Sequence, residues 1–436
     1  MKTRYFVPII LVMTSCLYSC NHNSRDDEFE ETPIIIESPT PTVQISKVSL
    51  SESQIPYVAA GNEFALRCLK TIYNDKNIVF SPLSLQYALA LTSNGANGES
   101  ADEITNAMGF DGNQEALNSY LNLLLNQLPA VDTDVELKLA DAVIINDRFR
   151  AQNSFRQTAK EYYYSPVEYA SSTEPEKVIA RINEWASRNT HGLINPFLEN
   201  GDINNSFIAI ILNALYFNAK WSNSLSSPAF TAESEAGPFY LDGGGSKNVK
   251  YMATKGYFQH GEIGSGHILE LPYANGKYSM YIILPEVKGD SEIADLLPKI
   301  NEKSLSSSLS SMTTDAVVLV QIPMFETSSR LDLNKSLNDL GISKIFSTEA
   351  EFDRLIENDN NVAFYINCVL QKARIKVNEW GTEAAAVTAE ILDGDNGEPD
   401  EEIEEISFIA DHPFVYIIAE KTSGVILFEG IFNGLE

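Results

Sequence analysis

The sequence is poor in the residues that build metal sites and disulfide frameworks. Only four cysteines and five histidines occur in 436 residues, and two of the cysteines lie within the first twenty positions. The other two, Cys68 and Cys368, lack the short-range spacing of disulfide-rich or zinc-binding domains, so we expect two small buried residues and no disulfide. No H-E-x-x-H pattern joins the histidines, which excludes the ligand set of the zinc hydrolases.

Catalytic motifs are missing as well. The chain has no G-x-S-x-G elbow to hold a serine nucleophile on a strained turn. Gly243-Gly244-Gly245 is followed by Ser246-Lys247 without the spacing of a phosphate-binding loop, and we interpret it as a hairpin turn. The acidic stretch 393–397 departs from a calcium-binding loop at Gly397 and Glu398, so calcium is only a minor alternative. We therefore predict a protein that is not an enzyme and uses neither a metal nor a cofactor.

Basic residues are scarce relative to acidic ones. Thirty-one Lys and Arg stand against sixty Asp and Glu, which leaves a formal net charge of -29. Such a charge repels nucleic acids and anionic lipid surfaces, so a nucleic-acid partner is excluded. The acidity is typical of a soluble extracellular protein.

No apolar run in the first twenty residues is long enough to span a bilayer, yet this segment has the layout of a secretory signal. Lys2 and Arg4 precede an apolar run over residues 5–13. The sequence Leu17-Tyr18-Ser19-Cys20 then resembles a bacterial lipobox, which predicts a signal peptide over 1–19 and a lipid on Cys20. The alternative is an ordinary signal peptide with two incidental cysteines.

The stretch after Cys20 is polar, acidic and proline-bearing, and it lacks the apolar residues needed for a core. We predict a disordered, lipidated tether over 20–55, followed by a folded domain over 56–436. The acidic patch 24–28 resembles surface-export signals of some Gram-negative lipoproteins. The expected localisation is therefore an exported, membrane-anchored lipoprotein at the cell surface or outside the cell.

The domain itself combines helical and strand patterns without a regular repeat. Hydrophobic residues, at 44% of the chain, are sufficient for a large core. Apolar residues at three- and four-residue spacing predict helices over 55–73, 84–91, 115–128, 182–188 and 334–340. Runs rich in β-branched and aromatic residues predict strands over 207–217, 267–271, 280–284, 317–322, 362–370, 372–377 and 414–419. We predict one α+β domain.

The segment 372–411 is unusual. Residues 382–389 are small, and as a strand they would present Thr382, Ala384, Ala386 and Thr388 on one side, slim enough to enter between packed strands. The acidic connection that follows, through about Ile409, is far longer than an ordinary loop. It is therefore either functional or an unstructured surface insertion.

This segment closely resembles the hinge and reactive loop of the serpin family, through Val377-Asn378-Glu379 and Gly381-Thr382-Glu383-Ala384-Ala385-Ala386. Two earlier stretches, 77–84 and 213–221, resemble the family's first core signature and its central-sheet strand. Further similar stretches follow in the family's order, at 182–185, 269–273, 333–346 and 411–414. The resemblance covers about residues 56–434.

The resemblance implies a fold of three β-sheets surrounded by about nine helices, with an exposed reactive loop. It also implies a monomer that acts as an irreversible suicide substrate of extracellular serine or cysteine proteases. A non-inhibitory serpin that acts as a binding or structural surface lipoprotein is the alternative. An exported hydrolase or an adhesin is a rival from another class.

The resemblance assigns roles to residues in three groups. The hinge comprises Glu379, Gly381, Thr382, Glu383, Ala384, Ala385 and Ala386, with Thr382 the first side chain to turn inward. The region where the sheet opens comprises Ser81, Ser84, Asn213 and Gln371. Trp221 would cover the upper breach, with a plain core tryptophan as the alternative. Gln371 stands where the family usually has histidine, so we expect altered pH sensitivity but retained opening.

The family's usual spacing places the scissile bond at Asp395-Asn396, with Leu392 as the alternative. No Lys or Arg occurs between Val377 and Glu420, which disfavours proteases of trypsin type. We expect elastase-like, subtilisin-like or acid-preferring targets. Glu390 would face inward after insertion, where an unpaired carboxylate is costly.

Overall fold

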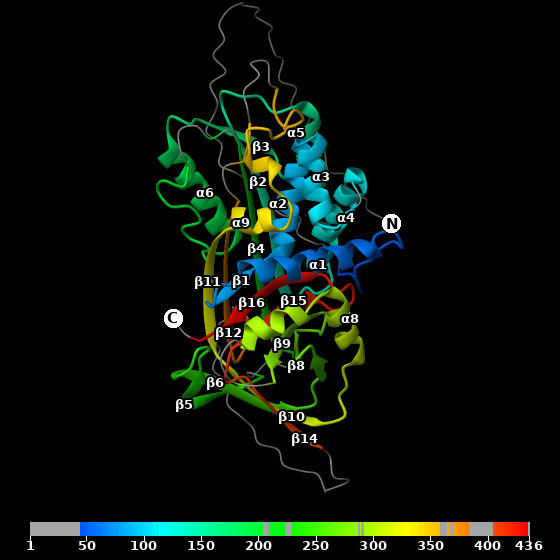
Figure 1. Ribbon diagram of the computed structural model, residues 1–436, viewed down its shortest axis with the longest axis vertical. Helices are drawn as coiled ribbons and strands as arrows, with labels where there is room; N and C mark the ends of the chain where they lie inside the picture. The colour runs from blue at the N-terminus through cyan, green and yellow to red at the C-terminus, as the bar shows by residue number, and fades with distance from the viewer. Residues whose placement is uncertain are drawn as a thin grey trace, which may run out of the picture. The chain divides into compact units, whose positions relative to one another are not determined.

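The computed structural model of the chain is shown in Figure 1. It describes residues 44–110, 112–203, 207, 209–222, 229–286, 288, 292–357, 364–366, 369–382 and 404–434. Several sequence predictions fall outside these ranges. They concern the signal peptide and Cys20, Cys368, the hinge residues Glu383, Ala384, Ala385 and Ala386, and the cleavage sites Leu392, Asp395 and Asn396.

The described residues form nine α-helices. They are α1 (Ile55–Ile72), α2 (Pro82–Gly95), α3 (Gly98–Ala107), α4 (Gln114–Gln127), α5 (Asn153–Tyr163), α6 (Pro175–Asn189), α7 (Glu292–Leu296), α8 (Glu302–Ser311) and α9 (Asn334–Asp339). The local sequence explains the start of α2, because Ser81 caps it by accepting a hydrogen bond from the backbone N–H of Ser84 at 3.2 Å. Pro82 follows at the first helical position, where its missing N–H costs nothing.

The strands form three sheets. We call the first the main sheet, with the order β11 (Phe325–Asp332), β12 (Leu370–Asn378), β13 (Gly381–Thr382), β4 (Ala209–Lys220), β2 (Val135–Asn146) and β3 (Val167–Ala170). The second has the order β1 (Ile78–Phe80), β16 (Ile426–Phe432), β15 (Phe414–Glu420), β9 (Tyr278–Pro285), β8 (Gly266–Tyr273) and β7 (His260–Ile263). The third has the order β14 (Glu405–Ile409), β10 (Val317–Pro323), β6 (Ser246–Gly256) and β5 (Thr231–Tyr240).

Two hydrophobic cores lie on the two faces of the main sheet. Alternate residues of β4 point to opposite faces, as in any strand. Leu215 and Phe217 belong to the large core, which the sheet shares with α1, α2 and the second sheet. Leu212 and Ala214 belong to the small core, which includes Trp185 of α6. Figure 1 shows α6 on one side of β4 and α2 on the other.

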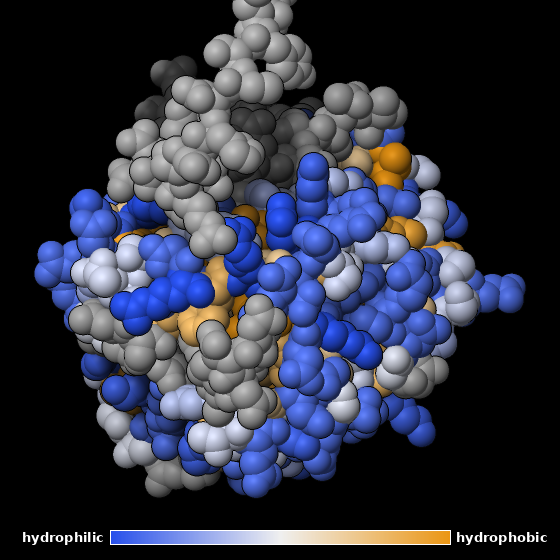
Figure 2. Space-filling model, turned by 90° about the horizontal axis from the view of Figure 1, so that it is seen from above, coloured by the Kyte–Doolittle hydropathy of each residue, from blue (hydrophilic) through white to orange (hydrophobic). Residues whose placement is uncertain are grey.

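The molecular surface carries mostly polar side chains. Figure 2 shows a face that is largely hydrophilic, with apolar residues in small patches only. Within the described ranges, no helix combines the length and apolar character needed to cross a bilayer. The same ranges hold no cluster of three or more His, Cys, Asp or Glu side chains able to bind a metal ion.

Most predicted elements are present, and the α+β class is confirmed. The three glycines at 243–245 form the predicted hairpin turn between β5 and β6, and all three have positive φ angles. Cys68 is buried and free, as predicted. The predicted strand over 362–370 is wrong, because β12 begins only at Leu370 and residues 364–366 are not in a strand. Phe364 instead packs its ring against that of Phe352, at 4.9 Å between ring centroids. Its apolar side chain therefore packs from a loop and not from a strand.

Residues 44–54, at the end of the predicted tether, contact the domain. Val48 is buried in the large core, and the backbone N–H of Ile45 donates to the carbonyl oxygen of Ala130 at 2.9 Å. Lys277 also donates from Nζ to the carbonyl oxygen of Ser46. This part of the expected tether therefore lies against the folded domain.

Candidate functional site

The candidate site is the gap between β4 and β12 in the middle of the main sheet. These strands have twelve and nine residues. Only the two residues of β13 lie between them among the described residues, and β13 is antiparallel to both. Gly381 pairs with Asn378 and Lys220, and Thr382 pairs with Val377 and Ala219. Beyond β13, no ladder joins β12 directly to β4 among the described residues, so both facing edges could pair with a longer strand.

Gly381 is required where the chain enters this gap. Its φ is +154°, and a Cβ at this position would lie 2.1 Å from the carbonyl oxygen of Ala219. Any side chain would therefore push β13 away from β4. The side chain of Asn378 supports the turn before it, because Oδ1 accepts hydrogen bonds from the backbone N–H of Trp380 at 2.9 Å and of Gly381 at 3.2 Å.

Thr382 is buried at the end of the gap where β12 ends, with 1% of its surface exposed. Its hydroxyl lies 2.5 Å from the hydroxyl of Tyr273. Burial raises the pKa of Tyr273, and the hydrogen bond to Thr382 opposes this only in part. Tyr273 therefore stays neutral and holds β13 through a polar contact inside the core.

Trp221 covers the turn that joins β12 to β13. Its ring stacks on Tyr273 at 4.5 Å between centroids and 10° between planes. The Nε1–H of Trp221 donates a hydrogen bond to the carbonyl oxygen of Asn378 at 2.9 Å. The backbone N–H of Trp221 donates to the carbonyl oxygen of Trp380 at 2.8 Å. The backbone carbonyl oxygen of Glu379, in the same turn, accepts a hydrogen bond at 3.4 Å from the backbone N–H of Phe230.

Ser81, Ser84 and Gln371 form a second group, next to the start of β12. Gln371 Nε2 donates to the carbonyl oxygen of Ser81, and the backbone N–H of Ser81 donates to Gln371 Oε1, both at 2.9 Å. The Ser81 hydroxyl donates to the carbonyl oxygen of Leu427 at 2.9 Å. This group joins β12, the start of α2 and β16 in one buried network. The backbone of Asn213 lies in β4, paired with Asp141 of β2.

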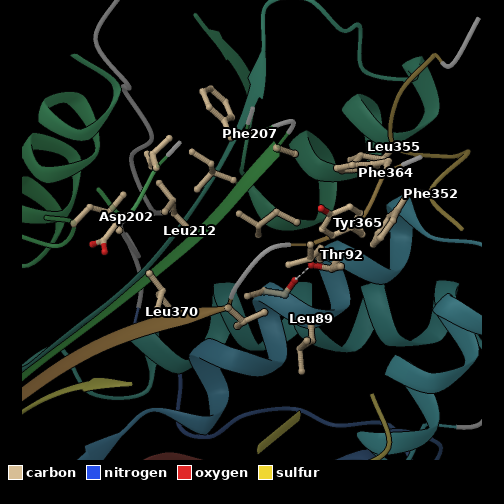
Figure 3. A pocket seen from close by; sticks show the side chains of 18 of the residues that line it. Leu89, Thr92, Asp202, Phe207, Leu212, Phe352, Leu355, Phe364, Tyr365 and Leu370 are labelled. Atoms are coloured by element: carbon tan, nitrogen blue, oxygen red, sulfur yellow. Dashed lines mark hydrogen bonds between the residues drawn. The ribbon is translucent and has the colours of Figure 1, made fainter. Parts of the chain in front are cut away.

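An apolar cavity of about 360 Å³ lies at the far end of the gap (Figure 3). Residues 209–212 of β4 line it, together with Val369 and Leu370 at the start of β12. Thr92 and Leu89 of α2 line it from below the sheet. The gap therefore has a polar hinge at one end and an apolar cavity at the other.

The structure brings the predicted residues together in part. Trp221, Gly381 and Thr382 lie at one end of the gap, whereas Ser81, Ser84 and Gln371 lie further along β12. Sequence reasoning missed the roles of Tyr273, Asn378 and the cavity. The stretch 269–273 already pointed to Tyr273, but no local pattern could show that its hydroxyl reaches Thr382, which is 109 residues away.

Comparisons with known proteins agree on one family. A model described as serpin (serine protease inhibitor) matches residues 59–434. Serpin-ZXA of Oryza sativa subsp. japonica is 29% identical over 368 residues, which cover 81% of this chain and 89% of the relative.

Solved structures give the same answer. The thermophilic serpin tengpin in its native state has a TM-score of 0.77 at 25% identity, over 90% of this chain and 97% of the other. Serpin48 of the insect Tenebrio molitor has a TM-score of 0.75 at 27% identity, over 89% of this chain and 100% of the other.

Proposed function

The chain belongs to the serpin family, and from that premise we propose that it irreversibly inactivates extracellular serine or cysteine proteases. Serpins are mostly inhibitors rather than enzymes. The observation that carries the proposal is the two-residue strand β13, which pairs with β12 and β4 at one end of the region between them. In this proposal, β13 is the start of the inserted strand, and the facing edges of β12 and β4 would pair with its continuation.

The proposed mechanism begins when a protease attacks the loop that follows Thr382. The nucleophile of the protease forms an acyl-enzyme with the new carboxyl end, and the amine of the following residue leaves. The freed front half of the loop then extends β13 between β4 and β12, the strand insertion for which serpins are known. The attached protease is pulled along, so the oxyanion geometry that deacylation requires is disturbed.

The hinge sequence suits this insertion. Thr382 already faces the large core, and the following alternate positions, Ala384, Ala386 and Thr388, carry small side chains. Small side chains can enter a packed sheet without displacing its neighbours. We propose that Glu379 to Ala386 act as the hinge and that Ser81, Ser84, Asn213 and Gln371 lie where the sheet opens.

The target class follows from what the loop lacks. No Lys or Arg occurs from Asn378 to Ala419, so we propose targets of elastase-like, subtilisin-like or acid-preferring specificity. Cleavage at Asp395-Asn396, or at Leu392, stays a prediction. So do lipidation at Cys20, the tether and the cell-surface location, which we propose from the lipobox-like stretch 17–20.

The test is to incubate the purified protein with a protease panel and look for a complex that survives SDS. Thr382→Arg should turn the inhibitor into a substrate, because a charged side chain cannot enter the core beside Tyr273. Thr422→Arg is the matched control, because Thr422 is exposed in a turn. Unchanged inhibition by Thr382→Arg would refute insertion. A folded protein that forms no complex with any protease would favour the non-inhibitory alternative.

A further inference from the structure

A second cavity, of about 340 Å³, lies between the second and third sheets. Residues 254–256 of β6 line it from the third sheet, and residues 270–272 of β8 line it from the second. It shares no lining residue with the cavity at the end of the gap. Its volume lies at the lower end of the range that is typical of small-molecule sites.

The absence of a side chain at Gly256 leaves part of this space open. Gly256 pairs with Val318 of β10, and Val318 is fully buried in the large core. Residues directly opposite each other in antiparallel strands point to the same face, so a side chain at position 256 would point inward. A Cβ there would meet only the ring of Phe258, at 3.6 Å.

The backbone does not require glycine at position 256. Gly256 is not among the glycines with a positive φ, and its ladder with β10 continues to Tyr251 without a register shift. Glycine in a strand marks a bulge, a bend or a place that a ligand or another backbone approaches closely. The effect of Gly256 is therefore the room that it leaves for an approaching group.

Aromatic side chains form much of the cavity lining. Trp221 and Phe230 are each 3% exposed, and their ring centroids lie 5.8 Å apart. Tyr257 also lines the cavity, yet 60% of its surface is exposed. Aromatic rings attract one another beyond the effect of buried area. These residues favour a planar aromatic ligand, whose binding would also remove surface of Tyr257 from water.

The charged side chains that line the cavity are already paired. Nζ of Lys421 lies 2.6 Å from Oε1 of the buried Glu270. Lys255 points to the outer face, because it pairs with the exposed Leu319, and its Nζ lies 2.6 Å from Oε1 of Glu405. A charged ligand would lose its hydration without gaining a new counter-ion, so a neutral ligand is favoured.

We propose that this cavity binds a neutral aromatic molecule of one or two rings that carries a hydrogen-bond acceptor. Its rings pack against Trp221 and Phe230, and its acceptor receives a hydrogen bond from the ammonium group of Lys421. That group has three N–H donors, so it can bond a ligand and keep its contact with Glu270. This site goes beyond the proposed inhibition of proteases and does not depend on it.

The experiment titrates the full chain with the fluorescent dye Prodan, a neutral naphthalene that carries a ketone and a dimethylamino group. The dye emission should shift to shorter wavelength and reach saturation. Gly256→Leu should weaken this binding at least tenfold, because the added side chain occupies the space. Gly261→Leu is the matched control, because Gly261 does not line the cavity and a Cβ there meets Met312 at an ordinary 3.5 Å.

An unchanged affinity of Gly256→Leu, or no saturable shift with the wild type, overturns the site. Thr254→Met is a second filling variant, in case Gly256→Leu does not fold. Thr254 pairs with the buried Val320, so its side chain also points inward. This variant should weaken Prodan binding at least threefold, and an unchanged affinity would count against the site in the same way.

The charge of the ligand is tested by competition against Prodan at pH 7. Acetylnaphthalene and naphthoate of the same substitution share one ring system and differ mainly in the charge of the substituent. Acetylnaphthalene should displace Prodan at a concentration at least tenfold lower, because naphthoate would enter without a counter-ion. Equal or better competition by naphthoate overturns the neutral class of ligand.

Lys421→Met tests the proposed donor. It should weaken Prodan binding about fivefold, the effect of one lost hydrogen bond, and leave the affinity for dimethylaminonaphthalene unchanged, because that molecule lacks the ketone. A general disturbance of the cavity would weaken both molecules equally, and that result overturns the role of Lys421. Protease inhibition is measured separately, so failure of dye binding leaves the proposed inhibition untouched.

Discussion

Gln371 and Ser81 are joined by two hydrogen bonds of 2.9 Å, although they are 290 residues apart in sequence. The side-chain amide of Gln371 accepts a hydrogen bond from the backbone N–H of Ser81 and donates one to its carbonyl oxygen, which also accepts from the backbone N–H of Leu85. Since Gln371 belongs to β12 and Ser81 caps α2, this pair fixes β12 on the large core. Glutamine does this without a titratable group, which a histidine at the same place would introduce.

Gln371→Ala should lower the free energy of unfolding by about 1–3 kcal/mol, because it leaves the buried N–H of Ser81 without its acceptor, while the carbonyl oxygen keeps its bond from the backbone N–H of Leu85. Denaturant unfolding at pH 7 measures the effect. Gln157→Ala is the control, since Gln157 bonds Glu161 on the exposed face of α5 and should change stability by less than about 0.5 kcal/mol. Equal effects of the two substitutions would show that the Gln371–Ser81 pair is not stabilising.

Glu429 gives the protein a stability that falls as pH rises. It is fully buried in β16, and both carboxyl oxygens lack a hydrogen-bond partner among the described residues. Burial raises its pKa from 4.5 to about 8, with partial opposition from Lys70. The folded state therefore binds a proton that the unfolded state releases between these values. Stability is full below about pH 4.5 and declines up to about pH 8.

The decline due to Glu429 should amount to at most roughly 5 kcal/mol. Unfolding of wild type and Glu429→Gln at pH 5 and pH 8 isolates it, because the amide stays neutral at both. The variant should be the more stable protein at pH 8 and nearly equal at pH 5. Glu326→Gln, at an exposed site beside Arg374, is the control. A variant whose stability follows the wild-type pH curve would contradict the buried carboxylate as the cause.

The sequence predicted elements better than it predicted contacts. Helical spacing located α1, α4 and α6, because each of these helices buries one side against the core, so its apolar residues recur every three or four positions. The strand prediction over 362–370 failed, because Phe364 packs against Phe352 from a loop. A short apolar run does not distinguish a buried strand from a loop that packs on the core.

The candidate site was accessible to sequence only through resemblance. The residues Gly381 and Thr382 stand in the hinge motif, but their pairing with both β12 and β4 depends on tertiary structure. The cavity at the other end could not be predicted, because it joins α2, residues 352–355 and β4, which share no local pattern. Sequence reasoning grouped Ser81 with Gln371, but it could not show the hydrogen bonds between them.

Gly381→Ala should disrupt insertion while leaving the remaining fold intact. The added Cβ would approach the carbonyl oxygen of Ala219, so β13 must leave β4. We expect at least a tenfold smaller yield of SDS-resistant protease complex. Gly276→Ala is the matched control, because Gly276 also has a positive φ, of +73°, but a Cβ there meets nothing within 4 Å. A normal complex yield from Gly381→Ala would show that pairing of β13 with β4 is dispensable.

Cleavage of the loop should raise the thermal unfolding midpoint, because the freed segment would satisfy backbone groups on the facing edges of β4 and β12. The gain from a strand of about ten residues should exceed 10 °C, at roughly 2–4 °C per kcal/mol for a large domain. Differential scanning calorimetry before and after limited proteolysis measures it. Thr382→Arg should be cleaved equally well but show no gain, because its charged side chain would have to replace a buried hydroxyl beside Tyr273. Cleaved wild type that melts at the temperature of the intact protein would mean that the loop is cut without inserting, and the gap between β4 and β12 would then need another occupant.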